Sequence, residues 1–305
     1  MLGGNVVVRT EDRVSLPGHL VLDIYRTSRL DVDDGRPPSQ QWDEQLQRER
    51  LFHATSHRMS RIQLVDEESG VSAMVRDLQD YIQRHPRDAL IAVDLEGVDL
   101  GTDGTLCLMQ LATPDQLYLF DVAVYKDGIP PGLRKILEDP HVTKLMHDCR
   151  KDSAMLSQHN IRLDGVFDSQ VADILIRRNM TGQMPAYVRG LSLVLEQYLG
   201  ISEDHLAVKK TGREMMREDE RVWARRPIPD DLQKYAAFDV AALHALHGIM
   251  IEMMALELRI ATQKYLGVVR DEGKDTANKV PEFESGMLRY LFRNMARPQS
   301  ESKRN

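Results

Sequence analysis

The sequence is short of cysteine and has no long hydrophobic run. Its 305 residues include only two cysteines, Cys107 and Cys149, so neither a disulfide framework nor a cysteine-based zinc site can be built. No run approaches the roughly 18 to 20 apolar residues that a membrane-spanning helix needs, and the first residues lack the basic-then-apolar pattern of a signal peptide. We therefore expect an intracellular protein, in the cytoplasm or nucleus, without a membrane partner.

Basic residues are not in excess either, and the formal net charge is −7 at pH 7. This balance argues against a protein that holds nucleic acid through a general basic surface. It does not exclude nucleic acid, because carboxylates that hold metal ions lower the formal charge while the bound ions restore it locally. Contacts to nucleic acid would therefore have to come from local charge.

Several common catalytic motifs are absent. The sequence has no G-x-x-x-x-G-K-S/T loop, no G-x-G-x-x-G loop after a strand, no G-x-S-x-G elbow and no H-E-x-x-H helix. His244 and His247 lie three residues apart, but no third ligand is nearby in the sequence, so we expect them on a polar helix face. The carboxylates are the better candidates for chemistry.

Composition and patterning divide the chain into three parts. With 42% hydrophobic and 29% charged residues, it is typical of a soluble globular protein with one large domain and extensions. Residues 1–61 predict a small β module and a polar, proline-bearing linker, an extension that could bind a protein partner. Residues 62–259 form the predicted domain. Residues 260–305 predict a helical extension and a disordered tail.

Alternating strand and helix patterns begin after the linker. The buried run at 90–97 leads into a turn at Gly101 and Gly104. The apolar runs 106–112 and 117–124 form a hairpin with that strand. A three-stranded meander followed by alternating elements predicts an α/β fold with a mixed sheet of five to six strands, flanked by helices. The other expected elements are strands at 62–65 and 143–147 and helices at 71–81, 131–137, from 150, 168–178, 191–199 and 229–258.

Two acids on one strand are the first candidate site. Asp94 and Glu96 lie in the run IAVDLEG, so alternation points both side chains to one face while Leu95 points to the other. A D-x-E pair alone is a weak signal, since strand ends often carry acids and a second copy occurs at Asp66 and Glu68. The apolar residues before Asp94 place the first copy at the carboxyl end of a central strand.

Further acids come from two helices. Asp152 lies near the start of the helix after the 143–147 strand and can turn back toward the sheet edge. Asp148 is an alternative candidate for the same role. Asp152 could equally be an ordinary acid in the first turn of a helix, where the helix dipole stabilises its charge. Tyr235 and Asp239 are four residues apart and share one face of a nearly all-apolar helix. A lone aspartate there would be buried without a counter-charge.

Together these acids predict a metal site. Four ionised carboxylates about 4 Å apart repel by roughly 4 kcal/mol per pair at an effective dielectric of about 20, so clustering requires divalent cations. All-oxygen ligation selects Mg²⁺ or Mn²⁺ over zinc. Two such ions can stabilise the attacking and leaving oxygens of a phosphodiester displacement, so we expect two divalent cations, Mg²⁺ or Mn²⁺, as cofactors.

The order of the motifs resembles a known family. D-x-E, an aspartate in a helix led by a histidine, and Y-x-x-x-D are similar to the DEDD superfamily of 3′-5′ exonucleases, tyrosine subclass, over about residues 62–258. The segments VDLEG, LCLMQLA, FDSQVADIL and VWARRPIPDDLQKYAAFDV look closest to ribonuclease D-like and Egalitarian-type domains. The resemblance implies a ribonuclease H-like fold, two metal ions and release of nucleoside 5′-monophosphates from a 3′ end. It also implies that Tyr235 lies next to the attacking water, which we expect it to orient. The metal ligands that the resemblance implies are Asp94, Glu96, Asp152 and Asp239.

Substrate contacts are expected from local basic residues. Residues 209–226 hold seven basic and four acidic residues, and residues 177–189 hold three basic and none acidic. A solvated helix face explains any one of these residues as well as a phosphate contact does. Trp223 is expected to brace the last helix. We assign to substrate binding three basic residues and three neighbours of the acids, namely Lys209, Lys210, Arg213, Leu95, Gly97 and His147.

We therefore expect a metal-dependent 3′-5′ exonuclease that acts on the single-stranded 3′ end of RNA or DNA. RNA is favoured by similarity only. A catalytically silent RNA-binding adaptor of the Egalitarian type and a DNA-directed repair exonuclease are the alternatives.

Overall fold

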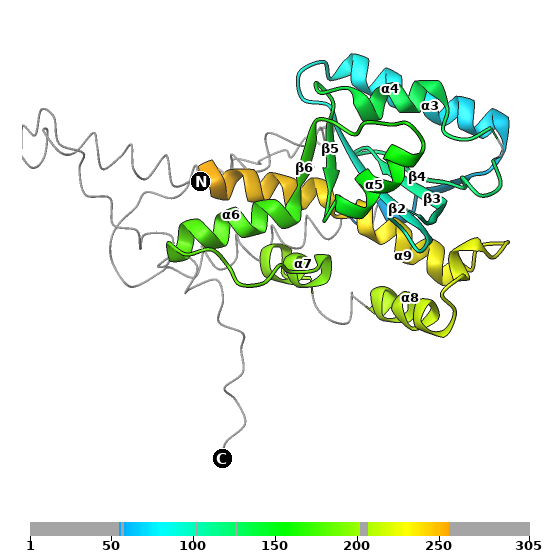
Figure 1. Ribbon diagram of the computed structural model, residues 1–305. Coiled ribbons are helices and arrows are strands. Elements are labelled where there is room, and N and C mark those ends of the chain that lie inside the picture. The colour runs from blue at the N-terminus through cyan, green and yellow to red at the C-terminus, as the bar shows by residue number, and fades with distance from the viewer. Residues whose placement is uncertain (1–54, 56–57, 102, 126, 202–206, 256–305) are drawn as a thin grey trace, which may run out of the picture.

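The computed structural model describes residues 55, 58–101, 103–125, 127–201 and 207–255 (Figure 1). The strands are β1 Ile62–Val65, β2 Leu90–Val98, β3 Thr105–Ala112, β4 Leu117–Phe120, β5 Thr143–Met146 and β6 Val166–Asp168. The helices are α3 Glu68–Arg84, α4 Pro131–Glu138, α5 Arg150–Gln158, α6 Ser169–Thr181, α7 Leu191–Leu199, α8 Ala207–Glu218 and α9 Asp230–Ala241, with a short 3-10 turn η1 at Val222–Ala224. Helical conformation resumes after a turn at Ala242 and continues to residue 255.

The six strands form one mixed sheet in the order β1-β4-β3-β2-β5-β6. β2 pairs antiparallel with β3, and β3 with β4, which is the meander that the sequence predicts. The other three pairs, β1 with β4, β2 with β5 and β5 with β6, are parallel. β2 is therefore a central strand, and its carboxyl end lies at the same edge of the sheet as the carboxyl end of β5.

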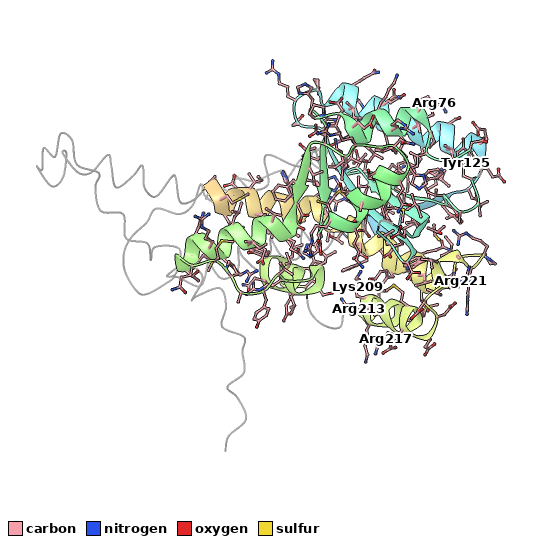
Figure 2. The ribbon with its side chains drawn as sticks, viewed as in Figure 1. Arg76, Tyr125, Lys209, Arg213, Arg217 and Arg221 are labelled. Atoms are coloured by element: carbon pink, nitrogen blue, oxygen red, sulfur yellow. The ribbon has the colours of Figure 1, made fainter. Side chains whose placement is uncertain are left out.

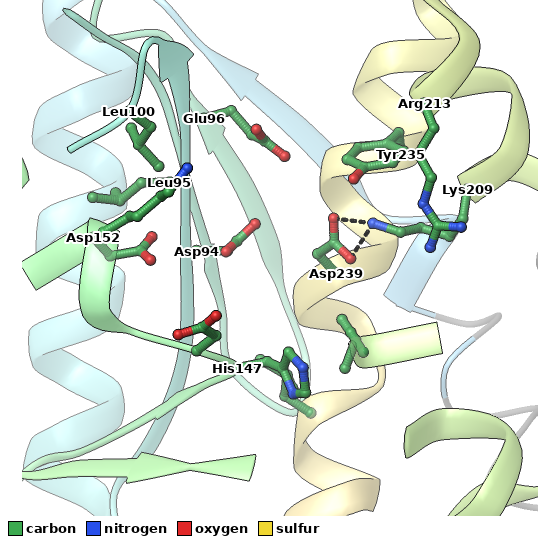
Figure 3. Close-up of a pocket in the computed structure, with 14 residues that line it drawn as sticks. Asp94, Leu95, Glu96, Leu100, His147, Asp152, Lys209, Arg213, Tyr235 and Asp239 are labelled. Atoms are coloured by element: carbon green, nitrogen blue, oxygen red, sulfur yellow. Dashed lines mark hydrogen bonds and ion pairs between the residues drawn. The ribbon is translucent and has the colours of Figure 1, made fainter. Parts of the chain in front are cut away.

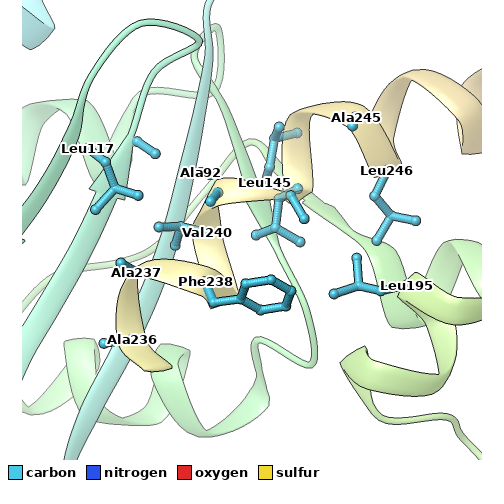
Figure 4. Packing of buried hydrophobic residues seen from close by; sticks show 14 of the residues in the cluster. Ala92, Leu117, Leu145, Leu195, Ala236, Ala237, Phe238, Val240, Ala245 and Leu246 are labelled. Atoms are coloured by element: carbon cyan, nitrogen blue, oxygen red, sulfur yellow. The ribbon is translucent and has the colours of Figure 1, made fainter. Parts of the chain in front are cut away.

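Helices cover both faces of the sheet (Figure 1). On one face, α3, α4 and α5 pack over alternate strand residues such as Ile91. On the other face, α6, α7 and α9 pack over the intervening residues, and Figure 4 shows Ala92 of β2 and Val240 of α9 in this second core. Because β2 buries both of its faces, Asp94 and Glu96 continue the face that α9 covers.

The expected order of elements is confirmed, with two additions and one shortening. The strand expected at 117–124 ends at Phe120, and the sequence analysis expected neither β6 nor α8 as an element. β6 has three residues, too few for a periodic pattern to be counted. α8 buries only Lys209 and Gly212, and charged residues surround its partly buried Val208, Met215 and Met216, so its apolar face in the sequence is narrow.

The segment before β1 contacts the fold. Arg58 is 2% exposed and donates hydrogen bonds from Nε to the Pro114 carbonyl (3.1 Å) and from Nη1 to the Ala241 carbonyl (2.5 Å). The packed unit therefore includes residue 58, within the segment that the sequence analysis assigned to an extension. The expected β module and the expected C-terminal tail lie outside the described residues.

His244 and His247 do not lie on a polar face, and that expectation was wrong. His244 is 4% exposed and its Nε2 donates to the Leu90 carbonyl at 3.1 Å, while His247 packs edge-on against Phe167. Burial lowers the pKa of His244 to about 3 and that of His247 to about 4, so both rings are neutral. The helix after Ala242 lies in the core, where a histidine is tolerated as a neutral ring with one carbonyl partner.

One helical stretch among the described residues, Asp230–Ala255, is long and apolar enough to cross a membrane by length and composition. Within the fold, 67% of its apolar window is buried. The core helix of a globular fold passes the same test, so this stretch is weak support for a membrane span.

A buried lysine ties the end of α4 to the sheet. Lys144 of β5 is fully buried, and its Nζ donates to the carbonyls of Ile136 (3.2 Å) and Asp139 (2.6 Å). These carbonyls belong to the last turn of α4 and the residue after it, where a helix leaves acceptors without partners. Burial lowers the pKa of Lys144 to about 8. The ammonium thus fixes β5, which leads into α5 and its acids.

We expect Lys144→Met to lower the free energy of unfolding by about 2 to 3 kcal/mol, because buried carbonyls lose a charged donor. Lys135→Met, at an exposed position of α4, is the matched control and should change stability by about 0.5 kcal/mol or less. Urea titrations followed by circular dichroism measure both. Equal stability of the two variants would contradict this role for Lys144.

Candidate functional site

A cleft of about 290 Å³ opens where the carboxyl ends of β2 and β5 face α9 (Figure 3). It collects side chains from β2, the start of α5, α8 and α9, which are far apart in the sequence. The lining residues are Asp94, Leu95, Glu96, Leu100, His147, Asp148, Lys151, Asp152, Leu191, Lys209, Arg213, Tyr235, Asp239 and Leu243. All four acids and the tyrosine that the sequence analysis grouped are in this lining.

β2 supplies two acids from one face of the strand. Asp94 lies opposite Gln110 of β3 and Glu96 lies opposite Leu108, and the register shifts directly after Glu96. Leu95 points to the other face and packs in the core beneath α3, α4 and α5. Strand alternation therefore directs Asp94 and Glu96 toward α9, as the sequence predicts.

The first turn of α5 supplies Asp152, which is 5% exposed. Asp168, at the end of β6, holds the turn that precedes this helix. Its carboxylate accepts the backbone N–H of Asp148 (3.1 Å) and of Cys149 (2.9 Å), and it also caps α6 by accepting the N–H of Gln170 (2.8 Å). One carboxylate thus fixes the start of two helices and, with it, the place of Asp152.

α9 and α8 close the cleft from the other side. Tyr235 and Asp239 lie one helical turn apart on α9, and both face the acids of β2 (Figure 3). Lys209 of α8 forms an ion pair with both carboxylate oxygens of Asp239, and its Nζ lies 3.4 Å from the centroid of the Tyr235 ring. This ammonium is the counter-charge that a buried aspartate on an apolar helix needs.

The Tyr235 ring is packed on more than one side. A Cβ atom added to Gly212 of α8 would lie 2.2 Å from Cδ2 of Tyr235, so only glycine allows this approach of the two helices. Trp223 of η1 is buried with its ring centroid 6.1 Å from that of Tyr235, and its Nε1–H donates to the Met216 sulfur at 3.3 Å. The expectation that Trp223 braces the last helix is confirmed.

His147 forms part of the wall of the cleft. Its Nε2 lies 3.1 Å from the Arg189 carbonyl and its Nδ1 lies 2.9 Å from the Ser169 hydroxyl. Burial lowers the pKa of His147, which favours the neutral ring. Since a carbonyl only accepts, Nε2 carries the proton in the neutral ring. Nδ1 lies against the Ser169 hydroxyl, whose proton also has the Met146 carbonyl within reach at 3.0 Å. Both ring nitrogens are occupied within the protein.

Burial and mutual repulsion raise the pKa values of the acids. Burial raises the pKa of Glu96 to about 8, with repulsion from Asp239 adding to the shift and Lys209 opposing it. Burial raises the pKa of Asp152 to about 7. The pKa of Asp94 lies well above its usual range because of burial and, next, the negative charges around it. Without cations, this cluster therefore holds protons near neutral pH.

Burial, followed by the charges of the surrounding acids, also raises the pKa of Tyr235. The phenol therefore keeps its proton at neutral pH. It offers an O–H donor at the cleft and is a poor base.

The donor set fits hard divalent cations. One carboxylate oxygen from each of Asp94, Glu96 and Asp239 lies within 4.8 Å of the others. Oδ1 of Asp152 is buried and has no hydrogen-bond partner among the described residues. The group contains oxygen donors without histidine or cysteine, which matches the preference of Mg²⁺ and Mn²⁺. Asp148, the alternative to Asp152, is half-exposed and paired with Arg150 at the rim.

Not every residue assigned to substrate binding lies in the cleft. Gly97 is outside the lining, and a Cβ there would meet the Thr105 carbonyl oxygen at 2.1 Å, so this glycine serves the approach of β3. Lys210 is also outside the lining and is exposed. Lys209 lines the cleft but is buried against Asp239, whereas a phosphate contact was expected. Arg213 lines the cleft and is exposed.

Sequence reasoning missed two residues beside the acids. Lys151 is an exposed cation in the cleft lining, next to Asp152 in the chain. Gln110 is fully buried opposite Asp94, and neither polar atom of its amide has a hydrogen-bond partner among the described residues. The amide in the otherwise apolar run LCLMQLA was a signal, because a buried amide normally has a partner.

Known families and relatives match most of this fold. A family model described as 3′-5′ exonuclease matches residues 62–255. The piRNA biogenesis protein EXD1 of Mus musculus is 31% identical over 192 residues, which make up 62% of this chain and 34% of that protein. An Egalitarian protein homolog of Caenorhabditis elegans is 25% identical over 238 residues, 74% of this chain and 40% of that protein. The chain thus spans well under two thirds of these relatives.

Solved structures agree with the family match. Trypanosoma brucei RNase D in complex with RNA U12 aligns with a TM-score of 0.55 and 25% identity, over 80% of this chain and 82% of that chain. The expected fold class, a ribonuclease H-like mixed sheet flanked by helices, is confirmed.

We expect Glu96→Gln to flatten the pH dependence of stability in the metal-free protein. The pKa of Glu96 is raised to about 8 in the folded state and lies at about 4.3 in the unfolded chain. Its contribution to stability is therefore fully present below about pH 4.3 and lost as the pH rises to about 8. Melting temperatures in chelator should fall more steeply over this window for the wild type than for the variant. Glu196→Gln, exposed on α7, should follow the wild type.

Proposed function

Because this chain belongs to the 3′-5′ exonuclease family, whose members similar to it include RNase D, we propose that it shortens single-stranded nucleic acid from the 3′ end and releases nucleoside 5′-monophosphates. Residues 62–255 carry the exonuclease domain. The observation that carries the proposal is the convergence of Asp94, Glu96 and Asp239 within 4.8 Å beside Tyr235. Clustered oxygen donors next to a phenol O–H suit hydrolysis of a phosphodiester.

Two divalent cations, Mg²⁺ or Mn²⁺, would be held by the four acids. When bound, they supply Lewis-acid stabilisation of the charge that develops on the phosphate oxygens. The raised pKa values of Glu96 and Asp152 support this assignment, because bound cations would stabilise the charged carboxylates that burial and mutual repulsion disfavour. Asp152 contributes Oδ1, which has no hydrogen-bond partner to lose within the part of the chain that the structure describes.

Tyr235 is assigned to orient the attacking water. Since the phenol keeps its proton, its O–H would position the water through a hydrogen bond. This role does not require a phenolate that removes a proton from the water. The packing of Gly212 and Trp223 around the ring fixes where the hydroxyl lies. His147 has both nitrogens engaged by protein groups, so it serves as a wall of the cleft.

A basic stripe on α8 would guide the strand. Lys209, Arg213 and Arg217 follow at intervals of four residues along α8 (Figure 2). Arg213 lines the cleft, and its Nη2 donates to the Ser192 hydroxyl at 2.5 Å. Arg213 and Arg217 are exposed and can follow successive phosphates, whereas Lys209 is buried against Asp239. Across the cleft, Lys151 offers another exposed ammonium.

The second basic stretch, residues 177–189, offers less charge than the sequence implies. Arg177 and Arg189 both pair with the buried Asp173, at 2.7 and 3.5 Å. The Arg189 pair and a hydrogen bond from Arg177 Nη2 to the Tyr187 carbonyl (2.9 Å) tie the loop before α7 to α6, and the same loop places the Arg189 carbonyl against His147. We therefore assign backbone contacts mainly to α8.

RNA is the preferred substrate in this proposal. The support comes from relatives, since the RNase D structure contains RNA and EXD1 is named for piRNA biogenesis. A DNA-directed repair exonuclease would use the same acids. A catalytically silent RNA-binding adaptor is the second candidate, favoured by the match to an Egalitarian homolog and by the occupation of Asp239 by Lys209. The presence of all four acids and Tyr235 in one cleft favours the enzyme.

RNA and DNA oligonucleotides labelled at either end, incubated with Mg²⁺, Mn²⁺ or chelator, test the proposal. We expect RNA to lose one nucleotide at a time from its 3′ end with metal only, to stall at a duplex and to be blocked by a 3′-phosphate. RNA binding without shortening under either metal would support the adaptor, and faster shortening of DNA would support the repair enzyme. Cuts within a circular strand, or a ladder from the 5′ end, would contradict both exonuclease assignments.

We expect Tyr235→Phe to slow hydrolysis by about 10- to 1000-fold, because it removes one positioned hydrogen-bond donor. Mn²⁺ binding measured by calorimetry should be unchanged, whereas Asp94→Ala should lose hydrolysis altogether. The control is Tyr125→Phe, whose hydroxyl bonds Glu68 away from the cleft. A Tyr235→Phe protein that cleaves at the wild-type rate would refute the assignment of its hydroxyl.

A further inference from the structure

The cleft contains a positive charge of its own. Lys209 is 4% exposed, and its Nζ contacts both carboxylate oxygens of Asp239 while lying over the face of Tyr235 (Figure 3). Asp239 is also one of the three acids whose oxygens converge within 4.8 Å. The carboxylate of Asp239 therefore takes part both in an ion pair with Lys209 of α8 and in the acid cluster that fits divalent cations.

The packing of α8 keeps the lysine in this position. Lys209 and Gly212 are the buried residues of α8, and they lie three apart on the same helix face. At Gly212 the helix backbone rests against the Tyr235 ring. α8 therefore contacts Tyr235 twice, through its backbone at Gly212 and through the ammonium of Lys209.

An ammonium and a divalent cation compete for these oxygens. Nζ occupies both oxygens of Asp239, whereas a bound Mg²⁺ or Mn²⁺ needs at least one of them at about 2.1 Å. Two cations at that distance from one carboxylate also repel each other in a site partly shielded from water. Asp94 and Glu96 lie close enough that the same lysine acts on their charge.

We propose that Lys209 is an internal counter-ion that competes with metal for Asp239, so that loading of the site requires the ammonium to leave. The inference rests on the proposed function only in that the acids bind metal. In the metal-free protein, Lys209 offsets the repulsion among the acids and covers the carboxylate of Asp239. After metal binds, the flexible lysine stem carries the charge to the mouth of the cleft, where Arg213 already lines the wall.

The matched pair Lys209→Met and Lys210→Met tests the competition. Both variants remove one positive charge from α8, but Lys210 is exposed and outside the cleft. We expect Lys209→Met to bind Mn²⁺ about 10-fold or more tightly than the wild type, as measured by calorimetry on protein stripped of metal, and Lys210→Met to bind like the wild type. Circular dichroism establishes that each variant is folded.

A second measurement uses the wild-type protein, so it does not depend on a variant that folds. Amine acylation followed by mass spectrometry reports whether each lysine is accessible. We expect Lys209 to be protected in chelator and to become at least several-fold more reactive with Mn²⁺, while Lys210 stays reactive in both conditions.

The outcomes separate this inference from the proposed function. Mn²⁺ binding that is equal or weaker in Lys209→Met, or a Lys209 that stays protected while Mn²⁺ binds, would overturn the competition and leave the metal site intact. A wild-type protein and a Lys209→Met variant that both fail to bind Mn²⁺ would overturn the metal site itself. Equal gains in affinity in both variants would assign the effect to general charge and also overturn the competition.

Discussion

Burial of several like charges in one place is the constraint on which this fold depends. Asp94, Glu96 and Asp239 converge at one sheet edge, and burial raises the pKa of Glu96 to about 8. Such a cluster persists only if the elements that carry it cannot separate. Here β2 is buried by helices on both faces, so the free energy of two hydrophobic cores holds the acids together against their repulsion. Lys209 offsets part of the remaining charge.

The parts of the site that could be predicted are those set by local geometry. Alternation on a strand directs Asp94 and Glu96 to one face, and a spacing of four residues places Tyr235 beside Asp239. The need of Asp239 for a counter-charge could also be inferred from its apolar helix. The identity of that counter-charge could not, because Lys209 is thirty residues away and reaches it only through the packing of α8 on α9. β6 could not be predicted either, since a strand of three residues is too short to show an alternating pattern.

Tyr235 shows how packing decides chemistry. A tyrosine among carboxylates can in principle lose its proton or donate it, and burial together with the nearby negative charge selects the protonated form. The direction of the hydroxyl is fixed by contacts that carry no charge, a glycine backbone on α8 and an indole ring on η1. The Tyr235 hydroxyl is thus positioned by groups that carry no charge. A substitution at Gly212 or Trp223 would therefore change the site without altering any of its acids.

The contact of His244 with the Leu90 carbonyl has a consequence for how this chain can vary in length. β2 and the last long helix make polar contacts at both ends of their shared core, at Leu90 with His244 and at the acids with Asp239. A residue inserted between Asp239 and His244 would turn the rest of the helix by about 100°, so one of the two contacts would be lost. The segments 90–96 and 235–244 should therefore keep a constant length among relatives that retain both contacts.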